Sequence, residues 1–153
     1  MNLDEFKNSI PLFLAQAVDT GNNINGAVLS TSLESIYELD NVVEYLSHLR
    51  NKGLIDDNVS WNVSVSLGVL LGEMIIREHG FHWSMSDNGI PIVETEDGNQ
   101  LSPITKIHKI ITSEDGGNGS PSGFYNGFRA LQQYYEMTDE ERDMITTYIE
   151  DDV

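Results

Sequence analysis

The hydrophobic and polar residues of the N-terminal segment alternate with the period of a helix. Apolar side chains recur every three or four positions from Leu3 to Ala17. This pattern predicts a helix over 3–19, in which Pro11 introduces a kink or marks a restart because proline lacks the backbone N–H. The sequence GNNING that follows at 21–26 is typical of a chain break and predicts the end of this helix.

Two further helical stripes come before residue 80. The first, over 33–49, follows a Thr-Ser-Leu-Glu sequence at 31–34 that is typical of a capping box, and Gly53 ends it. The second, over 62–79, stops at Gly80, which suits the left-handed conformation that closes many helices.

In the middle of the chain the period changes from that of a helix to that of a strand. Segments 81–85 and 90–95 flank the sequence SDNG, which predicts a β-hairpin over 81–95. A second turn signal, Asp-Gly, precedes a short third strand around Gln100. The Ser-Pro pair at 102–103 then predicts the start of a short helix rich in isoleucine.

The C-terminal part predicts a flexible loop at about 113–123, followed by helices over 124–136 and 138–150. The whole pattern predicts an α+β fold in a single domain, 1–153. About five to six helices would surround a small antiparallel sheet built on the hairpin.

The chain is strongly acidic: 25 aspartates and glutamates stand against 8 lysines and arginines, a formal net charge of −17. Nucleic acid and anionic membranes are therefore disfavoured as ligands, because both are bound through lysine and arginine. A basic protein is the complementary partner, and the charge would steer its approach.

Other features of the composition set the expected compartment. The chain has no cysteine, which excludes disulfides and thiolate ligands. Its first residues lack the basic segment of a signal peptide, and no apolar run approaches the roughly 18 residues of a membrane span. A soluble cytoplasmic protein that needs no cofactor is the expectation.

The stretch LGVLLGEMIIREHGFHW at 67–83 carries the main candidate chemistry. Ser64, Gly68 and Gly72 form a ridge of small residues along which another helix, or the hairpin, can approach closely. Glu73 lies in the same apolar segment. It could act as a general base or metal ligand, but a structural role is favoured, with backbone N–H groups or Arg77 as its partner.

Two histidines, His79 and His82, follow Glu73. Zinc sites use histidine and carboxylate, but the metalloprotease pattern needs both imidazoles on one continuous helix, and Gly80 interrupts this one. His108 could join them only through the fold. The acidic segment at 113–119 lacks the alternating ligands of a calcium loop. We therefore expect neither a metal site nor a catalytic residue.

The acidic excess is densest at the C-terminal end, with ten acidic and two basic residues in 113–153. Acids at the start of the last helix also stabilise its N-terminus, which is the simplest explanation for them. As a partner surface, this end offers Asp139, Glu140, Glu141, Asp143 and Asp151, with the tyrosines Tyr134, Tyr135 and Tyr148 as anchors or, equally, as core residues. A competing acidic patch consists of Glu94, Glu96, Asp97, Glu114 and Asp115.

Part of the chain resembles a widespread group of small bacterial domains. The likeness covers 33–131 and rests on Leu67-Gly-x-x-Leu-Gly-Glu73, the tryptophan-bearing strand, the hairpin and Leu101-Ser-Pro103. It implies an α+β fold and no established activity, with Gly68, Gly72, Glu73 and Trp83 as motif residues. In size, acidity and lack of cysteine, the chain is also similar to bacterial immunity proteins, which neutralise toxins from competing cells.

These observations predict a non-enzymatic acidic binding protein. It would be a bacterial immunity protein or antitoxin that blocks a basic toxin, such as a nuclease, by occupying its active site or substrate groove. Carboxylates would then stand where the phosphates of a substrate lie. The alternatives are a housekeeping domain of unknown role and a hydrolase that uses Glu73 with His79 or His82.

Overall fold

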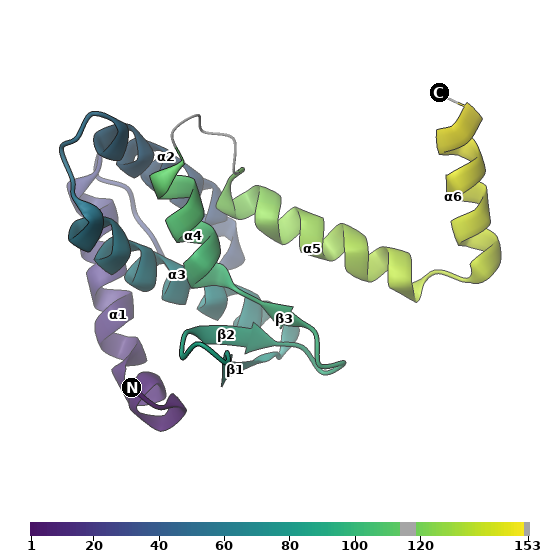
Figure 1. Ribbon diagram of the computed structural model, residues 1–153, viewed down its shortest axis with the longest axis horizontal. Helices are drawn as coiled ribbons and strands as arrows, with labels where there is room; N and C mark the ends of the chain where they lie inside the picture. The colour runs from purple at the N-terminus through teal and green to yellow at the C-terminus, as the bar shows by residue number, and fades with distance from the viewer. Residues whose placement is uncertain (114–118, 152–153) are drawn as a thin grey trace. The chain divides into compact units, whose positions relative to one another are not determined.

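Contacts within the computed structural model divide the chain into two compact units, 1–122 and 123–153. The structure describes residues 1–113 and 119–151, with side chains as far as residue 145. The first unit contains α1 (Leu3–Asn23), the 3-10 turn η1 (Leu33–Ser35), α2 (Ile36–Asn51), α3 (Asp57–His79), β1 (His82–Met85), β2 (Pro91–Glu94), β3 (Gln100–Leu101) and α4 (Pro103–Thr112). Helix α5 (Pro121–Glu136) begins at the end of this unit and, with α6 (Asp139–Asp151), makes up the second (Figure 1). The predicted α+β class is confirmed.

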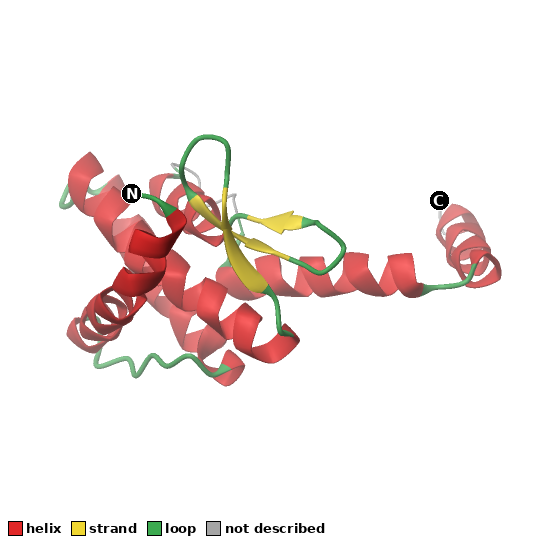
Figure 2. Ribbon diagram, turned by 90° about the horizontal axis from the view of Figure 1, so that it is seen from below, coloured by secondary structure: helices red, strands yellow, loops and turns green. Residues whose placement is uncertain are grey.

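Helix α3 is the centre of the first unit. Helices α1 and α4 pack against it, and α2 packs against both α3 and α4 (Figures 1 and 2). The middle of α3 is buried on every side, and its fully buried side chains are Leu67, Val69, Leu70, Leu71, Met74 and Ile75. Apolar burial on this scale is the main source of stability for a domain of this size.

The same helix corrects one expectation. By length and composition α3 could cross a membrane, although the sequence was expected to hold no apolar run of that length. However, 61% of its most apolar window is buried inside the protein. Burial of this kind is typical of the core helix of a soluble protein.

The hairpin predicted at 81–95 is present. Strand β1 pairs antiparallel with β2, with Trp83 opposite Val93, and β2 pairs antiparallel with β3, with Val93 opposite Leu101. Gly89, in the turn, has a φ of 78°, a backbone conformation that glycine adopts without strain. Trp83 and Val93 are both buried, so the hairpin directs the tryptophan into the core of the unit.

Helix α1 is continuous through Pro11 and ends at Asn23, within the GNNING sequence that was predicted to end it. Pro11 lies within the helix, and the burial of Phe6 and Ala17 on either side of it stabilises the helical path. At Gly21 an added Cβ would lie 2.8 Å from the side chain of Leu29. This glycine therefore makes room for Leu29 and does not end the helix.

Two helix starts differ from the prediction because of the hydrogen bonds that nearby side chains make. Thr31 does not cap a helix; its Oγ1 accepts a hydrogen bond from Arg77 Nη1 at 2.7 Å, and the 3-10 turn begins after Ser32 without a side-chain cap. Helix α3 begins five residues early, at Asp57, since the side chain of the preceding aspartate accepts the Val59 N–H at 2.9 Å.

Helix α5 starts inside the loop predicted for 113–123. It begins at Pro121, where the Asp40 carboxylate of α2 accepts a hydrogen bond from the Ser122 backbone N–H at 2.8 Å and another from its hydroxyl. An aspartate far away in sequence thus stabilises the first turn of this helix. Most of the predicted loop, 114–118, lies outside the described residues.

Candidate functional site

The glycines of α3 mark the places where two other elements touch it. At Gly68 an added Cβ would lie 2.5 Å from the Cα of Ile104, in the first turn of α4. At Gly72 it would lie 2.2 Å from the Cη2 atom of Trp83 on β1. Both distances are far below ordinary van der Waals contact, so each position requires a residue without a side chain. The ridge therefore brings α4 and the hairpin, both partners that the sequence allowed, against α3.

Glu73 lies beside this contact and links three segments of the first unit. Its Oε2 accepts a hydrogen bond from Trp83 Nε1 at 3.3 Å, and its Oε1 lies 3.7 Å from Arg77 Nη2. Arg77 also donates to Thr31 Oγ1 at 2.7 Å. With a side chain that is 13% exposed and engaged on both oxygens, Glu73 connects β1, α3 and the segment before η1. This arrangement favours a structural role over a general base.

Replacing Glu73 separates these two roles. Glu73→Ala removes the acceptor of a largely buried indole N–H and should lower the free energy of unfolding by about 1–3 kcal/mol. Glu73→Gln keeps a side-chain oxygen and loses mainly the ion pair with an exposed arginine, which contributes less than about 1 kcal/mol. Urea unfolding measures both. Retained stability with loss of biological activity in Glu73→Gln would instead favour a catalytic role.

The two histidines that follow Glu73 are used differently. The His79 ring stacks on Phe81 with centroids 5.2 Å apart, and His82 is exposed on β1. Across the described residues, no three side chains of histidine, aspartate or glutamate form a group that could hold a metal ion. A hydrolase built on Glu73 and these histidines therefore gains no support from the geometry.

His108 belongs to a polar cluster between α3 and α4. Its Nδ1 lies 3.4 Å from Ser64 Oγ, and the Ser64 hydroxyl donates to the Ser60 carbonyl at 2.6 Å. Burial lowers the pKa of His108, Arg50 lowers it further, and Asp57 opposes them. The serine hydroxyl already donates its proton to the helix backbone and not to the imidazole. The pair is thus not arranged as a nucleophile and its base.

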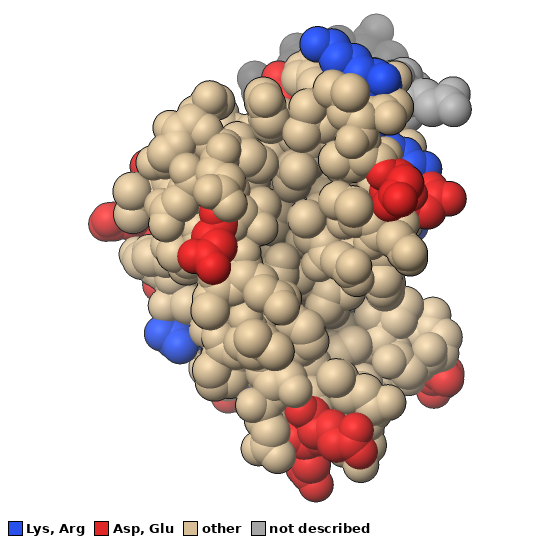
Figure 3. Space-filling view, turned by 90° about the vertical axis from the view of Figure 1, so that its left-hand side faces the viewer, with Lys and Arg blue, Asp and Glu red and all other residues tan. Residues whose placement is uncertain are grey.

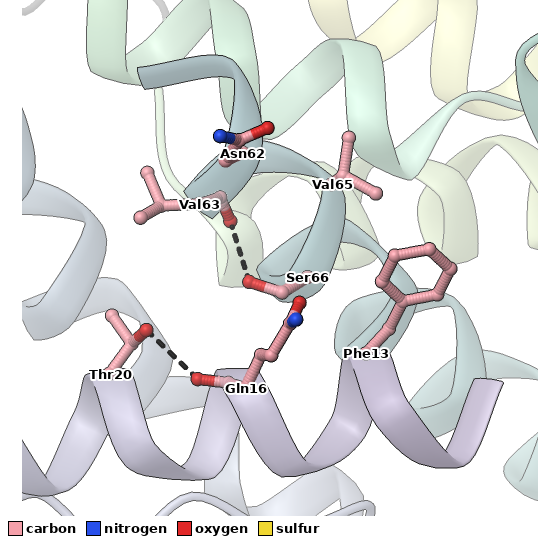
Figure 4. A pocket seen from close by; sticks show the side chains of 7 residues that line it. All are labelled: Phe13, Gln16, Thr20, Asn62, Val63, Val65 and Ser66. Carbon is pink, nitrogen blue, oxygen red and sulfur yellow. Dashed lines mark hydrogen bonds between the residues drawn. The ribbon is translucent and has the colours of Figure 1, made fainter. Parts of the chain in front are cut away.

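A cavity of about 460 Å³ lies between α1 and α3 (Figure 4). Its walls are uncharged, and they consist of Phe13, Gln16, Thr20, Asn62, Val63, Val65 and Ser66. Two of its hydroxyls are bonded to their own helices, that of Thr20 to the Gln16 carbonyl and that of Ser66 to the Val63 carbonyl. The walls contain no titratable group, so the cavity offers no acid, base or nucleophile.

The C-terminal acidic candidates lie on the first turns of α6. All four that the structure describes are exposed, Asp139 to 97%, and they are Asp139, Glu140, Glu141 and Asp143. The Glu141 N–H donates to Thr138 Oγ1 at 3.2 Å, so a threonine caps the helix. The side chains of Asp151 and Tyr148 lie outside the described residues.

The competing acidic candidates lie in the first unit. Glu94 is partly buried on β2 opposite His82, and Glu96 and Asp97 are exposed in the turn between β2 and β3. Glu114 and Asp115 lie outside the described residues. The structure therefore divides the acidic candidates between the two units.

Sequence reasoning missed Arg142, which shapes the junction between α5 and α6. Its guanidinium donates to the carbonyls of Tyr134, Tyr135 and Met137 at 3.1, 3.0 and 2.9 Å, and it lies 5.5 Å from the centre of the Tyr134 ring. The last carbonyls of a helix lack partners within the helix, and a basic side chain can bond them; the Tyr134 carbonyl also accepts the Met137 N–H at 3.2 Å. The available signal was a lone arginine in an acidic helix.

The two described tyrosines are surface residues. Tyr134 is 39% and Tyr135 is 63% exposed, and their rings meet edge to face with centroids 6.0 Å apart. Figure 3 shows one face of the molecule, where acidic side chains lie in separate small groups on a largely uncharged surface.

Comparisons with protein families, curated proteins and solved structures give no significant match.

Proposed function

We propose that this chain is a non-enzymatic cytoplasmic binding protein that neutralises a basic protein, in the first instance a bacterial toxin, by direct binding. The observation that carries the proposal is the charge. Even if every lysine and arginine paired with a carboxylate, an excess of 17 acidic residues would remain. Such an excess destabilises the compact state through self-repulsion, so a function that uses it explains its presence better than folding does.

The placement of the acids supports binding and not catalysis. The described carboxylates of α6 are exposed and stand next to exposed tyrosines. Tyrosines commonly supply the energetic centre of an interface, while charges at the rim accelerate encounter. In this mechanism the carboxylates occupy the cationic groove that the toxin uses for its substrate, and the tyrosines anchor the complex.

The test is reconstitution with a basic toxin candidate encoded next to this chain in its native genome. We expect co-expression to restore growth and the two proteins to co-purify at low salt in a defined ratio. An unrelated protein of equal length and net charge is the control for non-specific attraction. If the candidate toxin is basic and active but forms no complex at low salt, this function is wrong.

A further inference from the structure

Both helices of the second unit carry exposed apolar side chains. On α5, Leu131 is 54% and Tyr135 is 63% exposed; on α6, Met144 is 69% and Ile145 is 38% exposed. Figures 1 and 2 show α6 turning away from the end of α5 instead of lying back along it, so neither helix covers the other. Exposed apolar side chains concentrated in one short stretch are typical of a binding surface.

Arg142 holds this arrangement in a defined geometry. From the first turns of α6, it bonds the carbonyls of Tyr134 and Tyr135 at the end of α5 and of Met137 just after it, and so joins the two helices at a corner. We call this surface the α5–α6 corner. It comprises Leu131, Tyr134, Tyr135, Met144 and Ile145, with the flanking acids Asp139, Glu140, Glu141 and Asp143.

The charge around the corner selects its occupant. Residues 123–153 contain eight acidic and two basic residues, and one of the basic residues, Arg142, is engaged with backbone carbonyls. A second copy of this chain would place the same acids against each other, which costs free energy. A cationic partner with an apolar stripe satisfies both the exposed side chains and the carboxylates. Methionine also suits the recognition of helices, because its flexible side chain adapts to different shapes.

We propose that the α5–α6 corner binds a basic amphipathic helix of the partner protein. The apolar face of that helix lies on the exposed side chains of α5 and α6, and its lysines or arginines face the acids at the start of α6. This inference rests on the proposed function and adds to it the place of binding and the shape of the partner.

The experiment uses the full chain and two synthetic leucine–lysine peptides of identical composition. In one, the leucines recur at helical spacing; in the other, their order is scrambled. We expect the patterned peptide to bind, and Leu131→Ala with Tyr135→Ala to weaken binding by about tenfold or more. The matched control is Leu54→Ala with Tyr37→Ala in the first unit, where the side chains are 66% and 64% exposed. It should change binding by less than about twofold. Three of these residues lie in helices, where alanine is favourable, and Leu54 is exposed in the loop after α2, so both pairs should keep their circular dichroism.

Arg142→Met provides an independent test. It makes the chain more negative, so attraction by charge alone predicts tighter peptide binding. Loss of the corner predicts weaker binding, and this is the result that we expect.

The remaining outcomes are distinguishable. Equal binding of the scrambled peptide, or equal effects of the two alanine pairs, overturns the corner while leaving a basic partner in place. Failure of wild type to bind either peptide at low salt counts against the proposed function as well. Sedimentation could show that the wild-type chain is a dimer and that the variant with Leu131→Ala and Tyr135→Ala is a monomer. A second copy would then cover the corner, and the inference would be wrong.

Discussion

Replacing Gly72 with alanine is expected to lower the free energy of unfolding by about 3 kcal/mol or more, a fall of roughly 10 °C in melting temperature. The new methyl group would lie 2.2 Å from the Trp83 ring. That ring is 5% exposed and meets Phe6 edge to face on another side, with centroids 4.9 Å apart. It cannot move aside without disturbing the core. Urea and thermal unfolding measure the loss, and the fluorescence of Trp83 should change with it.

A double-mutant cycle identifies the cause of this loss. If the clash with the indole is responsible, Gly72→Ala should cost much less in a Trp83→Leu background than in wild type. Gly127→Ala is the control for the chemical change, since a Cβ there meets nothing within 4 Å. It should stabilise α5 by up to about 1 kcal/mol. Equal losses in both backgrounds would show that the ridge does not depend on Trp83.

In the first unit, the features that could be predicted from the sequence are those that depend on residues close together in the chain. The hairpin was predicted because its turn sequence and alternating strands are neighbours in the chain, and Gly80 ends α3 for a reason that lies in its own φ of 73°. The packing of Gly21 could not be predicted in this way, because Leu29, which folds back onto it, belongs to the segment after the helix. The start of α5 at Pro121 depends on a carboxylate of α2, which no local pattern reveals.

In the candidate site, too, contacts within one helix could be predicted from the sequence, whereas contacts between elements could not. The spacing of Glu73 and Arg77 on one helical face predicted their pairing, whereas the hydrogen bond from Trp83 needs the tertiary position of β1. The exposure of Tyr134 and Tyr135 also depends on tertiary structure, so the sequence alone could not decide whether they are core or surface residues. Arg142 bonds the carbonyls of Tyr134 and Tyr135 in α5 and of Met137 just after it, contacts that no local sequence pattern reveals.

Neutralising the C-terminal acids is expected to slow association with a basic toxin by about tenfold or more at low salt. The variant replaces Asp139, Glu140, Asp143 and Asp151 with asparagine or glutamine. Most of the loss should appear in the association rate, because rim charges steer encounter more than they hold the complex. Stability should stay equal or rise as self-repulsion falls, although loss of acids from the first turn of α6 acts in the opposite direction. Stopped-flow mixing measures the rate.

The control is the competing acidic patch, neutralised in parallel at Glu94, Glu96, Asp97, Glu114 and Asp115. If the C-terminal acids form the interface, this second variant should associate at close to the wild-type rate. At 1 M salt the Debye length falls to about 3 Å, so the difference between wild type and the C-terminal variant should disappear. A slower rate only in the second variant would move the interface to the first unit. If neither variant alters association with a confirmed partner, the acids are not an interface, and charge mimicry is wrong.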